Sequence, residues 1–210
     1  MKYAFIQRDR RVWPISVQCR VLRVSVAGYH EHFTVAKPNQ VWVGYLTYIP
    51  TDEGWLFLAV VIDLFSRRIV GWSLREQITG KIVIDALRMA WFLRCPDRKT
   101  DSKAGLIFHS DRGSQYASHE FNKLLKECGI TPSMSRKGNC WDNACSETLF
   151  GSLKVERLHG QHFETRRQGK DEAIDWLLWY NQTRLHSTLN YVSPMQFEQA
   201  SAFNMKTSAR

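Results

Sequence analysis

The sequence predicts an α/β fold in which a mixed β-sheet is flanked by helices. Three β-rich segments come first, at residues 41–74, and helix and strand patterns then alternate along the chain. The order βββ-α-β-α-β-α-α suits a layered α/β architecture. With 210 residues, 44% of them hydrophobic, the chain can bury a sizeable core within one domain.

The first three segments have the patterns of strands. Residues 41–49 alternate apolar with other residues, 55–64 form an apolar run typical of a buried strand, and 68–74 are β-rich. The stretch T-D-E-G predicts a hairpin between the first two strands. If this hairpin centres on Asp52, Tyr45 pairs with Ala59. Asp63 then shares the face of Tyr45 but lies about 13 Å away along the strands, so we interpret it as a structural or turn-stabilising acid.

The later elements are predicted by helix periodicity and helix caps. A helix after Thr79 ends at Cys95-Pro96, and its apolar face is formed by Val83, Ala86, Leu87, Ala90 and Trp91. Residues 106–108 and 130–134 are expected strands on either side of a helix that begins at Ser118 and stops before Gly129. Another helix runs from Asp142 or Asn143 to about Leu158. A last long helix carries Ile174, Leu177, Leu178 and Leu185.

We divide the chain into a basic N-terminal segment at residues 1–37, a core at 38–200 and a tail at 201–210. The first segment forms either two short helices, as in a helix-turn-helix, or a loosely packed tail.

The net charge of +9 favours a polyanionic partner over the alternative of a merely solvated basic surface. Five cysteines without a Cys-x-x-Cys spacing are typical of reduced thiols in the cytoplasm. Cys19, His30 and His32 could form half of a zinc site, but no second pair completes it. No apolar run is long enough to span a bilayer, so we expect no membrane partner.

Two carboxylates stand out by their positions. Asp111 follows the carboxyl end of a short strand, where ligands of open α/β sheets bind, and Glu147 lies in the first two turns of a helix. Taken alone, each is also explained as a solvated or capping acid.

Four separate motifs resemble insertion-sequence transposases with a retroviral-integrase-like core, in the subgroup named after insertion sequence three. They are V-I-D-L-F-S-R-R-I-V-G-W at 61–72, F-H-S-D-R-G-S-Q-Y at 108–116, N-x-x-x-E-T-L-F-x-x-L-K-x-E at 143–156 and W-Y-N-x-x-R-x-H-S-x-L at 179–189. The resemblance is collinear and covers residues 37 to 200.

The resemblance implies a ribonuclease-H-like fold with an Asp-Asp-Glu triad whose last two members have 35 residues between them. Asp111 and Glu147 have this spacing and match the second and third members. Carboxylates are the ligands that Mg²⁺ or Mn²⁺ prefers. Two such ions about 4 Å apart would support cleavage at the transposon ends and attack of the freed 3′-hydroxyl on target DNA.

In the resembling family this stretch has the pattern W-x-x-D-x-T-Y, and here it reads W-V-G-Y-L-T-Y at residues 42–48. Tyr45 therefore occupies the position of the family's first Asp. A phenol, with a reference pKa of about 10, is a poor ligand for a hard divalent ion and reaches farther than a carboxylate. Removing one oxyanion-stabilising donor costs about 10²–10³ in rate, and a shared metal ligand should cost at least as much. We therefore predict a silent or severely impaired triad.

The resemblance also implies that a helical stretch is missing near Glu31 to Phe33, as after an internal deletion in a decayed gene copy. Three rival interpretations remain open. They are an active enzyme that recruits Tyr45 or another acid, a non-catalytic protein that binds DNA or inhibits intact transposases, and an ordinary hydrolytic nuclease.

The expected partners are double-stranded DNA at insertion-sequence ends and in the target, together with further copies of this chain or intact transposase copies. Lys154 lies seven residues after Glu147, on the same helical face, where it could contact a phosphate. Further candidates for DNA contact flank the triad loops: Arg112, Arg136 and Lys137.

The expected location of the protein is the bacterial cytoplasm, at the nucleoid. His109 is either a satisfied core histidine or a support for Asp111, and the aromatic residues of 179–189 are either core or base-stacking groups.

Overall fold

The computed structural model describes residues 17, 21–22, 35–94, 105–134 and 144–207, and the side chains of 144–148 and 204–207 lie outside this description. Within these residues, five strands form one sheet in the order β3-β2-β1-β4-β5. The strands are β1 (Val41–Ile49), β2 (Leu56–Asp63), β3 (Ile69–Arg75), β4 (Ile107–Ser110) and β5 (Thr131–Met134). The first three are antiparallel, and β4 and β5 run parallel to β1. The predicted mixed sheet is confirmed.

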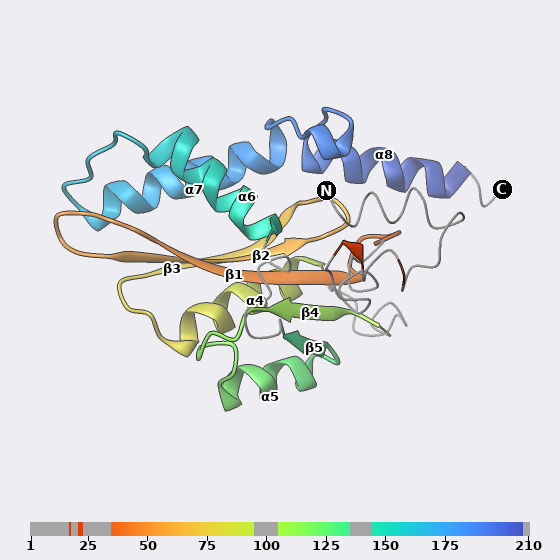
Figure 1. The fold of residues 1–210 in the computed structure, drawn as a ribbon, viewed down its shortest axis with the longest axis horizontal. Helices are drawn as coiled ribbons and strands as arrows, with labels where there is room; N and C mark the ends of the chain where they lie inside the picture. Colours follow the sequence, from red (N-terminus) through yellow and green to blue (C-terminus); the bar gives the residue numbers. More distant parts are fainter. Residues whose placement is uncertain (1–16, 18–20, 23–34, 95–104, 135–143, 208–210) are drawn as a thin grey trace.

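Helices cover both faces of the sheet (Figure 1). One face packs against α4 (Gly80–Arg94) and α5 (His119–Glu127). On the other side lie α6 (Ala144–Leu153), its π-helical continuation η3 (Lys154–Leu158), α7 (Arg166–Gln182), the 3₁₀ turn η4 (Ser187–Leu189) and α8 (Pro194–Thr207). Among the described residues no helix is long and apolar enough to cross a bilayer.

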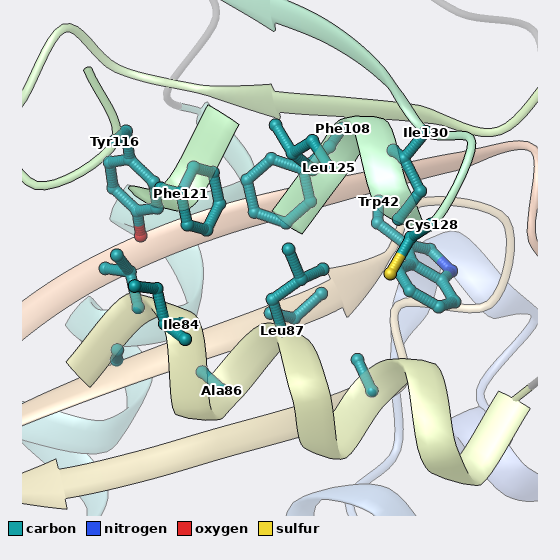
Figure 2. Close-up of a cluster of buried hydrophobic side chains, with 14 of the residues drawn as sticks. Trp42, Ile84, Ala86, Leu87, Phe108, Tyr116, Phe121, Leu125, Cys128 and Ile130 are labelled. Carbon is teal, nitrogen blue, oxygen red and sulfur yellow. The ribbon is translucent and has the colours of Figure 1, made fainter. Parts of the chain in front are cut away.

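The core under the α4 face is built from aromatic and aliphatic side chains of both layers. Figure 2 shows Phe108, Phe121 and Leu125 lying over Ile84 and Leu87 of α4. Burial of such side chains contributes about 1.5–3 kcal/mol each to the free energy of folding. This face supports the strands that carry the candidate site.

Several local predictions are confirmed. Ser118 caps α5 by accepting from the backbone N of Phe121 at 3.3 Å, and Gly129 follows the helix with a φ of 68°. Both features are the short-range signals from which the helix was predicted. The first strand has the predicted bounds, Val41–Ile49.

The predicted hairpin register is wrong by one residue. Tyr45 pairs with Val60 and Trp42 with Asp63, because the hairpin loop holds residues 50–55. This loop is closed by a hydrogen bond of 3.0 Å from the N of Gly54 to the O of Thr51, and Gly54 has a φ of 107° that favours glycine.

Asp63 therefore lies on the opposite face of the sheet from Tyr45, not on the same face as predicted. Its structural role is nevertheless confirmed, because its carboxylate accepts from the backbone N of Asn39 at 2.7 Å and of Phe65 at 2.9 Å. Burial raises the pKa of Asp63 above its ordinary value of 3.8.

The prediction of one last long helix is also wrong. α7 ends at Gln182, where the backbone N atoms of Thr183 and Arg184 both bond to the O of Trp179. Leu185 lies outside the helix and is 59% exposed.

A further helix, α8, was missed and runs through the predicted boundary at residue 200. Its signal is a reciprocal cap, since Ser193 and Gln196 each accept from the other's backbone N at 3.3 and 3.0 Å.

The exposed edge of β3 is closed by a side chain. The amide of Asn181 in α7 donates to the O of Ile69 and accepts from its N, both at 2.8 Å. A single side chain thus replaces a neighbouring strand at this position.

Glu198 attaches α8 to the opposite layer of the molecule. This buried carboxylate accepts from the hydroxyl of Ser66 at 2.6 Å and from Arg68 at 2.8 Å, and it pairs with Arg94 at the end of α4. Burial acts to raise the pKa of Glu198, but these hydrogen bonds and the charge of Arg94 hold it below its ordinary value of 4.5.

We expect Asn181→Ala to lower the free energy of unfolding by about 2–3 kcal/mol, because it leaves the buried N–H and C=O of Ile69 without partners. Urea denaturation would measure the change, with the exposed neighbour Gln182→Ala as the control. Equal effects of the two substitutions would contradict this role for Asn181.

We expect Glu198→Gln to lower the free energy of unfolding at neutral pH by about 2–3 kcal/mol, since it breaks a largely buried ion pair. A carboxylate whose folded pKa is depressed contributes stability above its unfolded pKa and loses it as pH falls through the folded pKa. The difference from the natural chain should therefore be constant between about pH 5 and 7 and shrink below pH 4.5. A pH-independent difference in urea titrations would contradict the assignment.

Candidate active site

The parallel pairing of β1 with β4 brings two predicted site positions together. Gly44 pairs with Ser110 at the end of this ladder, and Tyr45 and Asp111 each follow on their strands. Paired strands lie about 4.8 Å apart, so the two residues are neighbours.

Asp111 is exposed at the tip of β4, and a tight turn holds it. Its Oδ1 accepts from the backbone N of Gly113 at 2.8 Å. A Cβ at position 113 would lie 2.9 Å from this oxygen, so a larger residue there would displace the carboxylate. The carboxylate is thereby fixed at the carboxyl end of the sheet.

Tyr45 is only 5% exposed and belongs to the apolar cluster on the α6 face. Its ring meets that of Phe150 edge to face, with the centroids 6.4 Å apart. Leu149 and Leu153 of α6 join the same cluster. The ring of Tyr45 therefore extends the apolar core on this face of the sheet.

Tyr116 is a second phenol beside Asp111. Burial, followed by the charge of Asp111 and the neighbouring phenol of Tyr45, raises the pKa of Tyr116 well above 10. Tyr116 and Phe108 also fill the space next to Gly44, where an added Cβ would lie 2.8 Å from Phe108 Cε1 and 3.0 Å from Tyr116 Cε1. The α4 face beside Gly44, on the other side of the sheet from the Tyr45 ring, is thus closely packed by aromatic side chains.

Glu147 lies on α6, one turn before Phe150. The helix that carries it contacts Tyr45 through Phe150, but the side chain of Glu147 lies outside the described part of the structure. Arg136 and Lys137 lie outside the described residues as well. The same holds for Cys19, His30 and His32 and for the expected deletion point near 31–33.

Three further predicted residues are described. Lys154 is exposed, and its Nζ lies 5.2 Å from the ring centroid of Tyr48. Arg112 is exposed in the turn after Asp111. His109 is buried, and its Nδ1 lies 3.0 Å from the hydroxyl oxygen of Ser133, which favours the satisfied core histidine.

The motif at 179–189 forms part of the core. Tyr180 is 4% exposed and contacts Trp176, with ring centroids 5.0 Å apart. Arg184 binds Glu156, whose Oε1 lies 2.7 Å from Nη2 of the arginine. The sequence analysis did not single out Glu156, although it is the last residue of the motif at 143–156.

The described residues include only part of the expected metal centre, because the side chain of Glu147 lies outside them. They contain no group of three or more His, Cys, Asp or Glu side chains placed to hold a metal ion. Asp111 offers an exposed carboxylate oxygen of the kind that suits a hard divalent ion, whereas its neighbour Tyr45 presents a buried aromatic ring.

Comparison with known proteins identifies the family. A model described as "Integrase core domain" matches residues 35–140, and a second model of the same description matches residues 147–201. The chain belongs to the integrase core domain family. These two segments contain Tyr45, Asp111 and Glu147, so the candidate site lies within the integrase core.

Curated relatives of this integrase core are bacterial transposases. The chain is 43% identical over 191 residues to transposase InsF for insertion sequence IS3A of Escherichia coli K12. The aligned residues cover 90% of this chain and 64% of the relative. The chain is 45% identical over 171 residues to the transposase for insertion sequence element IS904 of Lactococcus lactis, covering 81% and 65%. The chain thus spans less than two thirds of these relatives. The predicted resemblance to the insertion-sequence-three subgroup is confirmed.

Solved structures confirm the predicted ribonuclease-H-like integrase fold. The HTLV-2 integrase catalytic core domain in complex with magnesium aligns with a TM-score of 0.54 and 20% identity, over 78% of this chain and 98% of that one. A simian T-cell lymphotropic virus intasome aligns with a TM-score of 0.61 and 17% identity, over 94% and 70%.

We expect Gly44→Ala to lower the free energy of unfolding by about 1–3 kcal/mol, because its Cβ overlaps the Phe108 ring. Gly151→Ala is the matched control. Nothing lies near its added Cβ, and it should stabilise α6 by about 0.5–1 kcal/mol. Urea denaturation compares them. Destabilisation by Gly151→Ala alone would contradict this packing.

Proposed function

We propose that this chain is a transposase-family DNA-binding protein whose metal-dependent cleavage and strand transfer at insertion-sequence ends is impaired. The observation that carries the proposal is Tyr45, which lies beside Asp111 across the β1–β4 ladder and packs against the helix that bears Glu147. Its ring adds apolar contacts there, whereas the reaction needs an ionised oxygen ligand.

The residues that would hold Mg²⁺ or Mn²⁺ are Asp111 and Glu147, and bound ions would supply activation of the attacking oxygen and stabilisation of the leaving oxygen. Asp111 is suited to this role by its exposure and by the turn that fixes it. Lys154 and Arg112, both exposed, and Arg136 and Lys137 are proposed phosphate contacts, consistent with a net charge of +9. The proposed site of action is the bacterial nucleoid in the cytoplasm.

A non-catalytic role is the second candidate. A chain that keeps DNA affinity but lacks one triad carboxylate would occupy insertion-sequence ends, or join copies of an intact transposase, without turnover. The presence of Tyr45 at the position of the expected carboxylate favours this role. An internal deletion near Glu31 to Phe33 would have the same consequence.

The test restores the missing carboxylate. Purified natural chain, Tyr45→Asp and Tyr45→Phe receive Mn²⁺ and duplexes that carry the ends of the element, and both strand cleavage and DNA binding are measured. We expect Tyr45→Asp to cleave at least about 100-fold faster than the other two. All three should bind DNA with an affinity that falls as salt rises.

The two controls identify the alternatives. Tyr45→Phe keeps the ring and removes the phenol oxygen, so cleavage by the natural chain that this variant loses would indicate a catalytic tyrosine. Cleavage by the natural chain that disappears in Asp111→Asn would overturn the proposed impairment. Products with hydrolysed ends and no strand transfer would indicate a nuclease. DNA binding without cleavage by folded Tyr45→Asp would favour the non-catalytic role.

A further inference from the structure

The helix that carries Glu147 changes its winding before it ends. α6 stops at Leu153 and continues as the π-helical turn η3, closed by a hydrogen bond of 2.6 Å from the N of His159 to the O of Lys154. A π turn is rare and rotates the side chains relative to an α-helix. No side chain of η3 is fully buried, and Leu158 at its end packs, partly buried, against the apolar clusters on this face of the sheet.

Arg184 holds both sides of this junction. Its Nη2 donates to the hydroxyl of Ser152 in α6 at 2.9 Å and to Glu156 Oε1 in η3 at 2.7 Å. Its Nε donates to Glu156 Oε1 at 2.9 Å and to Oε2 at 3.1 Å, and Trp176 Nε1 donates to Oε2 at 3.1 Å. Two parallel N–H···O bonds of this kind fix orientation as well as distance.

Arg184 is itself held in place. Its guanidinium carbon lies 5.8 Å from the ring centroid of Tyr180, and Nη1 lies 3.4 Å from Nδ1 of His186. Burial, followed by the charges of Arg184 and Arg67, lowers the pKa of His186 to about 4, so this imidazole is neutral at pH 7. A neutral imidazole can accept from the guanidinium without repelling it.

The orientation of α6 decides where position 147 points. Its described apolar contacts with the sheet come from Leu149, Phe150 and Leu153, all C-terminal to Glu147. A side chain ends about 6 Å from a helix axis, so a rotation of about 20° would move the tip of any side chain on this helix by about 2 Å. Misplacement by about 1 Å can cost about 100-fold in rate.

We propose that Arg184 is a positioning residue that sets the rotation of α6, and with it position 147, by joining Ser152 and Glu156 across the α-to-π junction. Its catalytic consequence depends on the proposed function above, and its structural consequence does not. The same surface offers a matched control, because Arg157 in η3 pairs with Glu172 at 3.2 Å without contacting α6 in this way.

The first measurement reads the helix directly and needs no catalysis. 4-Fluorophenylalanine at position 150 of the natural chain reports the contact with Tyr45 through its ¹⁹F shift. We expect Arg184→Met and Glu156→Gln to move or broaden this signal, and Arg157→Met to leave it unchanged. Urea titration beforehand identifies conditions in which every variant is folded. An unmoved signal in folded Arg184→Met would overturn the proposal.

The second measurement uses Tyr45→Asp as the background. Arg184→Met should weaken Mn²⁺ affinity, measured by calorimetry without DNA, by about 10–100-fold and should lower kcat on element-end duplexes at least as much. DNA affinity should not change. Arg184→Lys keeps the positive charge but cannot make the bidentate hydrogen bonds of a guanidinium, so it should restore little of the Mn²⁺ affinity or of kcat. Unchanged Mn²⁺ affinity and kcat, despite lower stability, would reduce Arg184 to a structural role and overturn the proposal.

The two measurements separate the two proposals. If Tyr45→Asp neither binds Mn²⁺ nor cleaves while the ¹⁹F signal responds to Arg184, the proposed function fails and only the structural half of this inference survives. If Tyr45→Asp is active and neither measurement responds to Arg184, this inference fails and the proposed function stands.

Discussion

The parallel ladder between β1 and β4 is the constraint on which the candidate site depends. It joins strands that are distant in sequence and places Tyr45 and Asp111 one residue beyond the Gly44–Ser110 pair. Side chains alternate along a strand, so a slip of one residue would turn Tyr45 to the α4 face and away from α6. The close contact of Phe108 with Gly44 opposes such a slip, because only a residue without Cβ fits there.

Tyr45 gives this part of the candidate site an apolar character. A carboxylate at this place would need ions or hydrogen bonds to offset its burial. The phenyl ring instead packs on Phe150 and adds to the cluster with Leu149 and Leu153. A bulky aromatic residue at position 45 is thus accommodated within a well-packed integrase fold.

The end of α7 serves two layers of the molecule. Asn181 satisfies the backbone of Ile69 at the edge of the sheet, and three residues later Arg184 reaches the junction of α6 and η3. The last turn of α7 and the residues just after it therefore both close the sheet edge and contact the helix that carries Glu147. Aromatic residues of this motif, such as Tyr180, provide the packing between the two contacts.

The sequence by itself determined the elements whose signals are local. Alternation defined β1, the cap at Ser118 and Gly129 defined α5, and motif spacing singled out Asp111 and Glu147. Only the tertiary structure decided the hairpin register, the end of α7, the π turn after α6 and the contacts of Glu156 with Arg184. Local signals depend on backbone propensity and caps within a few residues, whereas these four features depend on contacts between segments that meet only in the folded chain.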